Sequence, residues 1–280
     1  MEDLNNETQK GSEKQMSKKE ILTIISIILI ISLCVVIGII IKRQTSSQML
    51  IGGIKTINDA VNVIPIGNVT DEQIAITGNS ETLLYSDINP TNSTSIANDA
   101  EVIIIGTVKS IDGTVNYNPV AETYVFPRTV GQVTVNKVIK GNLNYNEIPF
   151  MKSGGILPVS EYEKSLRESE ISKMGLDKIS EEEKKTTYVK EVMSDDIEIQ
   201  EGKTYLMYLK YNQDYGCYII SYQKYGLREI DTNIESSNQA ILNSNTRTIQ
   251  SSEYSTIKVK DNENGKWVTL DSLIPSQYKK

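Results

Sequence analysis

Residues 101–108 read EVIIIGTV, and this run of apolar residues indicates how the fold is built. Such a run is typical of a buried β-strand, because Val and Ile pack well on a pleated surface. Gly106 interrupts the run, which predicts a bulge or the close approach of another chain segment. Farther along, Val133 and Val135 alternate with polar residues and predict a strand over residues 130–139.

Other short apolar runs extend the β pattern through much of the chain. Asp112-Gly113 is expected to form a turn after the first strand. Turns at intervals of about 8 to 12 residues predict a small closed barrel or a sandwich. The remaining expected strands are residues 123–126, 148–152, 187–192, 195–199, 204–210, 217–222 and 227–230.

Two further elements are expected, a helical insertion and a C-terminal hairpin. A helical insertion is predicted over residues 159–186, with Gly175 as a helix stop, because glycine readily adopts the left-handed conformation that ends helices. Near the C-terminus, Asn264-Gly265 predicts a small hairpin with strands at residues 256–260 and 266–270.

The N-terminal part contains residues 21–41, ILTIISIILIISLCVVIGIII, without a single charge. A helix of this length spans roughly 30 Å, the thickness of the hydrocarbon core of a bilayer. We expect a retained transmembrane helix, because Lys42-Arg43 follows it without a small-residue cleavage site. A cleaved signal peptide and a lipoprotein signal ending at Cys34 are the alternatives. The sequence therefore predicts a lipid bilayer as the partner of this segment.

Lysines before the helix favour an N-terminus inside the cell and a C-terminal domain outside. The polar residues 1–20 are expected to form a disordered cytoplasmic tail. Residues 42–95 are expected to form a juxtamembrane stalk or extension. The main β-barrel-like domain is expected at residues 96–231 and a C-terminal extension at residues 232–280. The predicted fold is a single transmembrane helix followed by a mainly β soluble domain with a helical insertion, α+β overall.

Composition excludes several classes of site. The chain has no His, which removes Ser-His-Asp catalysis, Cys-His catalysis and every His-ligated metal site. Cys217 is the only Cys outside residues 21–41, so no disulfide is expected within the domain. Residues 1–43 contain six Lys/Arg and five Asp/Glu, a net charge of +1. The whole chain has a net charge of −7, so residues 44–280 carry −8. Such an acidic domain predicts no nucleic-acid partner, and we expect no cofactor and no metal.

Three segments, in this order, resemble strands of a known barrel: residues 100–108 (AEVIIIGTV), 133–141 (VTVNKVIKG) and 202–209 (GKTYLMYL). The barrel that they resemble, strand by strand, is the OB-type barrel of the tissue inhibitors of metalloproteinases and of netrin C-terminal modules. The chain also looks like uncharacterised membrane-attached proteins of low-GC Gram-positive bacteria. The resemblance implies an OB-like barrel. It does not imply inhibition, because the inhibitors use an N-terminal Cys and disulfides that this chain lacks.

Tyrosines gather near the end of the predicted domain, and three of them are candidate ligand-binding residues. Exposed rings on a barrel sheet can stack on sugar rings, whereas buried rings would be cross-strand packing. The candidates are Tyr208, Tyr218 and Tyr222, within the cluster Tyr205, Tyr208, Tyr211, Tyr215, Tyr218, Tyr222 and Tyr225.

The expected function is a membrane-anchored, extracytoplasmic binding or interaction protein without enzymatic activity. Its partner would be a cell-envelope polymer or another protein. The alternatives are a cell-wall hydrolase that uses the carboxylates of Asp195, Asp196 or Glu198, and a membrane-bound sensor. The tripeptide Lys152-Ser153-Gly154 resembles the K-T-G motif of penicillin-binding enzymes, but it precedes both S-x-x-K matches, at residues 221–224 and 255–258. We interpret these matches as chance strand residues.

Overall fold

The computed structural model describes residues 57, 61–80, 88–194, 196–232, 241–242, 244 and 246–279. The predicted tail (1–20) and membrane helix (21–41) lie outside these residues. Within the described part, no helix is both long and apolar enough to cross a bilayer. The chain divides into two compact units, Met1–Gly52 and Gly53–Lys280, and every described residue belongs to the second.

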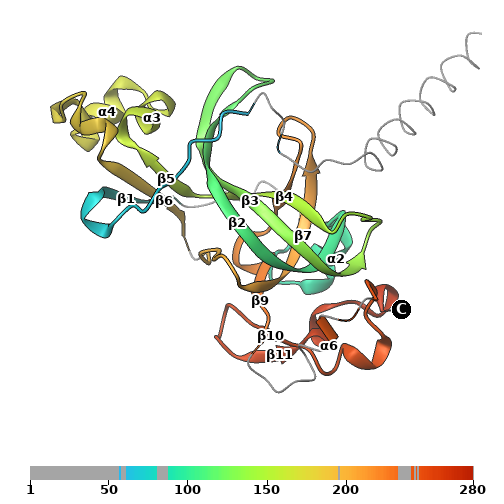
Figure 1. Cartoon of the computed structure of the whole chain (residues 1–280). Helices are drawn as coiled ribbons and strands as arrows, with labels where there is room; N and C mark the ends of the chain where they lie inside the picture. The colour runs from blue at the N-terminus through green and yellow to red at the C-terminus, as the bar shows by residue number, and fades with distance from the viewer. Residues whose placement is uncertain are drawn as a thin grey trace, which may run out of the picture. The chain divides into compact units, whose positions relative to one another are not determined.

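The described part is mainly β-structure with short helices, as the sequence predicts. The larger sheet has six strands in the order β2-β3-β4-β8-β7-β9, and β2 pairs in addition with β7 (Figure 1). The β4–β8 pair is parallel and the other described pairs of this sheet are antiparallel. The strands are β2 (Val102–Asn118), β3 (Thr123–Lys140), β4 (Glu147–Ser153), β7 (Thr204–Asn212), β8 (Cys217–Ile220) and β9 (Leu227–Glu229).

Alternate side chains of these strands form one apolar cluster, here called the inner cluster. Burial of each Val, Leu or Ile side chain contributes about 1.5–3 kcal/mol. A Cβ added at Gly106 would lie 2.4 Å from Cγ1 of Val133, and the register with β3 shifts beside it, so the predicted close approach and bulge are confirmed. The inner cluster includes Val102, Ile104, Val108, Val133, Val135, Ile148, Phe150, Ile199, Tyr205, Met207, Leu209, Tyr218 and Ile220.

The opposite faces of β2 and β7 are covered as well, which explains why both strands read as continuous apolar runs. There, Ile103, Ile105 and Leu206 belong to an outer cluster with α2 (Ser93–Asp99) and the C-terminal segment. Helix α2 begins where the Asn92 side chain accepts hydrogen bonds from two amides of its first turn. Such a cap stabilises a helix by about 1 kcal/mol.

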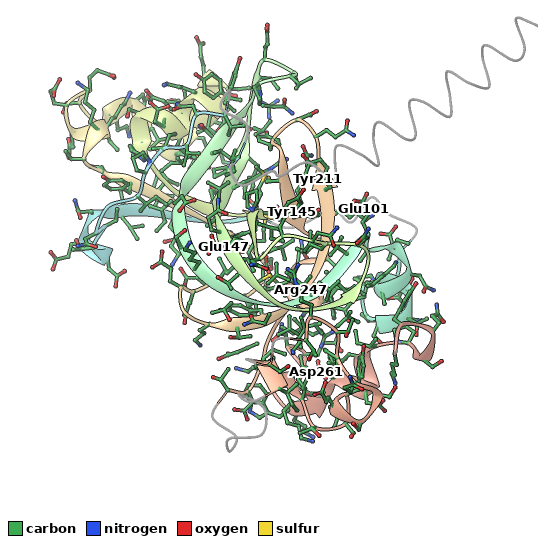
Figure 2. The ribbon with its side chains drawn as sticks, turned by 45° about the vertical axis from the view of Figure 1, so that its right-hand side comes forward. Glu101, Tyr145, Glu147, Tyr211, Arg247 and Asp261 are labelled. Atoms are coloured by element: carbon green, nitrogen blue, oxygen red, sulfur yellow. The ribbon has the colours of Figure 1, made fainter. Side chains whose placement is uncertain are left out.

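The C-terminal segment contains β10 (Lys258–Lys260) and β11 (Trp267–Thr269), followed by α6 (Leu270–Leu273). These strands pair antiparallel, which confirms the predicted hairpin. Two arginines tie the segment to the sheet. Arg247 donates to the carbonyl of Tyr145 in the loop between β3 and β4 (Figure 2). On β9, Nη1 of Arg228 lies 3.4 Å from Oδ1 of Asp261.

A second, three-stranded sheet has the order β1-β6-β5 and contains β1 (Ile74–Ser80), β5 (Gly155–Pro158) and β6 (Tyr188–Met193). The central strand β6 pairs parallel with β1 and antiparallel with β5. Strand β1 lies within the range predicted as a stalk. Between β5 and β6 the chain forms the predicted helical insertion, and Gly175 ends α4 with φ 71°, as expected. The insertion contains α3 (Val159–Tyr162), α4 (Glu168–Met174) and the 3₁₀ turns η2 (Glu163–Ser165), η3 (Leu176–Lys178) and η4 (Glu183–Lys185).

Two local predictions are wrong. Asp112-Gly113 is not a turn, because β2 continues through it as an irregular strand. Gly113 instead leaves room for a crossing segment: its added Cβ would lie 2.3 Å from the carbonyl oxygen of Ile64. Residues 196–199 of the expected strand 195–199 have no regular secondary structure, because no neighbouring strand pairs with them, and residue 195 lies outside the described part.

Candidate functional site

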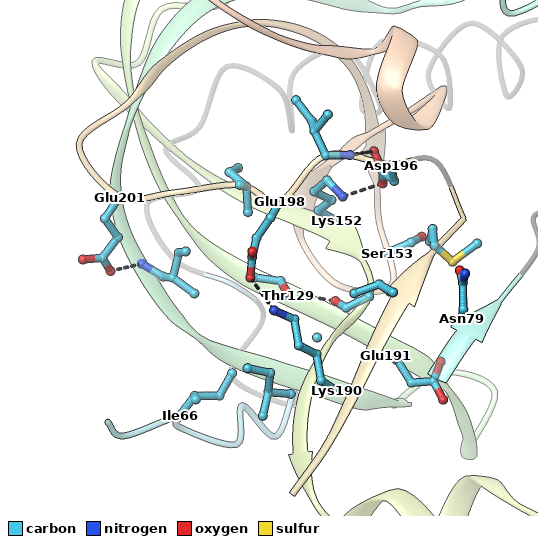
Figure 3. A pocket seen from close by; sticks show the side chains of 18 residues that line it. Ile66, Asn79, Thr129, Lys152, Ser153, Lys190, Glu191, Asp196, Glu198 and Glu201 are labelled. Atoms are coloured by element: carbon cyan, nitrogen blue, oxygen red, sulfur yellow. Dashed lines mark hydrogen bonds and ion pairs between the residues drawn. The ribbon is translucent and has the colours of Figure 1, made fainter. Parts of the chain in front are cut away.

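A cleft of about 570 Å³ lies where the end of β4 meets β5, β6 and residues 196–201 (Figure 3). Residues 196–201 are here called the strap. Charged and polar side chains from several separate segments line the cleft. Among them are Asn79, Lys152, Ser153, Lys190, Asp196, Glu198 and Glu201, and Thr129 on β3 and Glu191 on β6 line the cleft as well.

The innermost of these groups is an ion pair between Lys152 and Asp196. Lys152 lies on the same face of β4 as Ile148 and Phe150, at the end of the inner cluster. Its Nζ is 2.5 Å from Oδ2 of Asp196, and the two side chains are only 8% and 5% exposed. Because water is largely excluded, neither charge can lose the other without a cost of about 3–5 kcal/mol.

A second ion pair lies nearer the surface. Nζ of Lys190, on β6, is 3.0 Å from Oε1 of Glu198, whose side chain is 65% exposed. An exposed pair of this kind contributes about 0–1 kcal/mol. The two pairs therefore hold the strap with very different strengths, although each joins a strap carboxylate to a lysine of a strand.

The rest of the strap is held by few contacts. Glu201 accepts a hydrogen bond of 2.5 Å from the amide of Ile111 on β2, and the amide of Gln200 donates to the hydroxyl of Tyr205 over 3.2 Å. Ile199 is buried in the inner cluster. No residue of the strap belongs to a strand. The strap is therefore positioned by its side chains and not by a ladder of backbone hydrogen bonds.

Two neutral polar side chains in the cleft are available to a ligand. In the described part of the chain, neither the Ser153 hydroxyl nor the Asn79 amide has a hydrogen-bond partner. Both line the same cleft as Lys152 (Figure 3). A bound molecule could use them without breaking an existing hydrogen bond.

A buried carboxylate, that of Glu191 on β6, also lines the cleft. Glu191 accepts hydrogen bonds from the hydroxyls of Tyr162 and Ser80, the second over 3.3 Å. Gly78 on β1 leaves the space it needs, since an added Cβ would lie 2.2 Å from Oε1 of Glu191. Burial and the adjacent Glu191 carboxylate raise the pKa of Tyr162. In Figure 3 the Glu191 carboxylate points away from Asp196, so the two carboxylates do not form a facing pair.

The structure does not bring the three candidate tyrosines together on one surface. Tyr208 is fully buried in the outer cluster, and Tyr218 is 4% exposed in the inner cluster. The Tyr218 ring packs edge-to-face on Tyr211, with centroids 5.3 Å apart. As placed, neither Tyr208 nor Tyr218 presents a ring face to solvent, and their positions are those of cross-strand core packing.

Tyr222 is half-buried and lies after β8 with φ 64°. Its hydroxyl donates to Asp99, which also pairs with Nζ of Lys210 at 2.6 Å. Burial and the hydrogen bond to Asp99 raise the pKa of Tyr222, whereas Lys210 and then Tyr222 lower the pKa of Asp99. This arrangement fixes the end of α2 next to β7 and lies outside the cleft.

Sequence reasoning considered the two partners of the buried ion pair separately and assigned neither to a binding site. The sequence pattern treats Lys152 as a chance motif residue and Asp196 as a solvated carboxylate that matters only under the hydrolase alternative. Asp195, the other candidate in that segment, lies outside the described residues. The alternation of Ile148, Phe150 and Lys152 was the available signal, because it places a lysine at an inward position.

Comparison with protein-family models, with curated proteins and with solved structures finds no match for this chain. Within the described residues, no three or more His, Cys, Asp or Glu side chains are grouped to hold a metal ion.

Proposed function

We propose that this chain is an extracytoplasmic binding protein, anchored in the membrane by residues 21–41, whose cleft takes a ligand of the cell envelope. The cleft carries this proposal. It is concave, partly apolar and lined by a few polar groups from several segments, which is typical of small-molecule binding sites.

We further propose that the larger sheet is an OB-like barrel. The support is the cyclic pairing of β2, β3, β4, β8 and β7, with β7 returning to β2 and the β4–β8 pair parallel. Barrels of this type bind oligosaccharides and oligonucleotides on their surface and loops. This second support is an analogy of fold and says nothing about the particular ligand.

Binding is favoured over hydrolysis by how the carboxylates of the cleft are engaged. Asp196 is paired with Lys152, Glu198 with Lys190, and Glu201 with the Ile111 amide. The fourth carboxylate, that of Glu191, accepts hydrogen bonds from the hydroxyls of Tyr162 and Ser80. A glycosidase needs one carboxyl group to donate a proton and another to attack or to activate water across the bond that breaks. Carboxylates that neutralise neighbouring lysines are better suited to shaping a binding site.

The anchor and its orientation rest on the sequence of residues 1–43. Protease added to intact protoplasts that produce the full chain should remove the domain beyond Arg43. Protection of those residues until the membrane is permeabilised would reverse the proposed orientation.

Co-sedimentation tests binding. The full chain in nanodiscs is mixed with purified cell-wall polymer, beside the double variant Lys152→Met/Asp196→Asn and the control Lys185→Gln. The control removes an exposed pair with Glu182, outside the cleft. We expect the wild type and the control to sediment with the polymer and the double variant to stay in solution. Equal sedimentation of all three would move the site elsewhere. Cleavage of the polymer by the wild type, lost in Asp196→Asn, would favour a hydrolase.

A further inference from the structure

We propose that the strap occupies its own binding site: the Asp196 carboxylate holds the place of a ligand carboxylate, and the ligand binds to Lys152 by displacing the strap. This inference rests on the proposed binding function and adds to it the chemical class of the ligand and the way it enters.

The first step is the requirement of Lys152 for an anion. Its side chain is 8% exposed, and Asp196 is the only acceptor found for its ammonium in the described part of the chain. A buried ammonium without a counter-charge is strongly unfavourable. Any molecule that takes the place of Asp196 must therefore bring a negative charge to the same point.

The second step is that the strap can leave. It makes no strand pairing, and its outer contact, Glu198 with Lys190, is an exposed ion pair that water can replace at little cost. Displacement also takes Ile199 out of the inner cluster and Glu201 from the Ile111 amide, and this cost lowers the apparent affinity of the ligand. Once the strap moves, Asp196 becomes hydrated, so its carboxylate is not left unpaired. Lys190 then becomes a second cation at the rim of the cleft.

The third step concerns the rest of the ligand. Beside Lys152, the Ser153 hydroxyl and the Asn79 amide line the cleft without hydrogen-bond partners in the described residues. Together they offer donors and acceptors suited to amide groups. The site therefore fits a carboxylate attached to an amide-containing chain, as at the C-terminal end of a peptide.

The experiment uses the full chain in nanodiscs and isothermal titration calorimetry. The probe is N-acetyl-glycyl-glycine, and its C-terminal amide is the matched uncharged control. Inorganic phosphate is titrated separately, to distinguish a carboxylate site from a general anion site. We expect the acid to bind and its amide to fail. Equal binding of the acid and the amide would overturn the proposal. Phosphate binding as tight as that of the acid would contradict the carboxylate class.

Hydrogen exchange of the wild type tests displacement directly. Saturation with the acid should speed exchange of the amides of residues 197–201, because the strap leaves the cleft, while exchange of β4 and β6 slows or stays constant. A ligand that simply covers a closed strap would slow exchange at residues 197–201. That result would contradict displacement even if the acid binds.

Two variants add a test of the competing carboxylate. Asp196→Asn removes the charged occupant, so the acid should bind about tenfold more tightly than to the wild type. Lys152→Met/Asp196→Asn removes both buried charges, which keeps the site neutral, and it should not bind the acid. Unchanged affinity in both variants would overturn the proposal.

The outcomes separate this inference from the proposed function. If the acid binds as described but cell-wall polymer does not sediment the wild type, the anion site stands and the envelope ligand fails. If polymer sediments the wild type and the double variant equally and the acid does not bind, polymer binding stands at another site and the strap mechanism fails.

Discussion

The ammonium of Lys152 and the carboxylate of Asp196 lie 2.5 Å apart and almost fully buried, although 44 residues separate them in the chain. Lys152 follows Phe150 on the inward face of β4, where the inner cluster ends. The cleft therefore begins at the point where apolar packing gives way to an ion pair. Each of the two charges is tolerated there only because the other is present.

This dependence predicts a strongly non-additive pair of substitutions. Lys152→Met leaves the Asp196 carboxylate buried without a counter-charge, held only by a hydrogen bond from the Ile197 amide, and should lower the free energy of unfolding by about 3–5 kcal/mol. Asp196→Asn should also be costly. The double variant should recover most of this loss, because it buries no charge. Urea denaturation of the four proteins measures the coupling. Losses that simply add would show that the two side chains are not coupled as the structure indicates.

Local sequence patterns predict much of the β-structure. Alternation and apolar runs identify the core of β2, β3 and β7, and the glycines at positions 106 and 175 have the roles expected from their sequence context. The failures arise where distant segments meet. Asp112-Gly113 has the composition of a turn, but Ile64 pairs antiparallel with Thr114 beside it, and this close approach needs the glycine.

The strap shows the same limit at the candidate site. Residues 196–199 alternate between acidic and apolar residues, as a half-buried strand would. Alternation places Ile199 inward, and Ile199 is buried, but it would place Asp196 outward with Glu198, whereas the Asp196 side chain is only 5% exposed. Alternation also cannot supply a neighbouring strand, and the structure offers none. The partners of the strap carboxylates, Lys152 and Lys190, belong to strands whose position is set only by the complete fold.

Tyr208 provides a test that separates core packing from ligand stacking. Its ring is fully buried, and its hydroxyl has no hydrogen-bond partner in the described residues. Removing an unsatisfied buried hydroxyl removes a desolvation cost, so Tyr208→Phe should leave stability unchanged or raise it by about 1 kcal/mol. Tyr208→Ala should lower it by about 3–5 kcal/mol, because a large cavity forms. Thermal denaturation measures both. A stable, fully folded Tyr208→Ala protein would favour the exposed stacking surface instead.

Cys217 should be a poorly reactive thiol. It is fully buried at the start of β8, and burial raises its pKa to about 12, so the reactive thiolate is scarce at neutral pH. In a Cys34→Ser background, where Cys217 is the only thiol, a disulfide reagent at pH 8 should label the native protein far more slowly than the urea-unfolded protein. Equally fast labelling of both states would show that the thiol is accessible.

The same pKa shift has a consequence for stability at alkaline pH. Because the folded state holds the thiol proton more tightly than the unfolded state, this stabilisation is complete below about pH 9 and is lost as the pH rises toward 12. Cys217→Val lacks this contribution. Its stability relative to the Cys34→Ser protein should therefore improve between pH 9 and 11. A constant difference across that range would contradict the raised pKa.

Lys137 gives the opposite pH dependence, since burial lowers its pKa below the ordinary value of 10.5. Its side chain is fully buried, and its ammonium donates to the Ser244 hydroxyl and to the carbonyl of Thr246, each over 2.5 Å. These partners are neutral, so they satisfy the donors without balancing the charge. Glu253 opposes the shift through a weaker charge interaction.

The unfolded chain therefore binds a proton at Lys137 more tightly than the folded protein does. Stability should rise with pH from the lowered pKa toward 10.5, because the unfolded state gives up its advantage over that interval. Lys137→Met keeps an apolar side chain of similar length and removes the titrating group, so its stability relative to wild type should fall steadily as the pH approaches 10. Urea midpoints at half-unit steps from pH 7 to pH 10 measure this difference. Lys140→Met is the matched control, because it also removes one lysine of β3. The Lys140 amine instead donates hydrogen bonds to the carbonyls of Ala97 and Ala100 at the end of α2. Parallel pH profiles for wild type and Lys137→Met would mean that Lys137 keeps its ordinary proton affinity inside the fold.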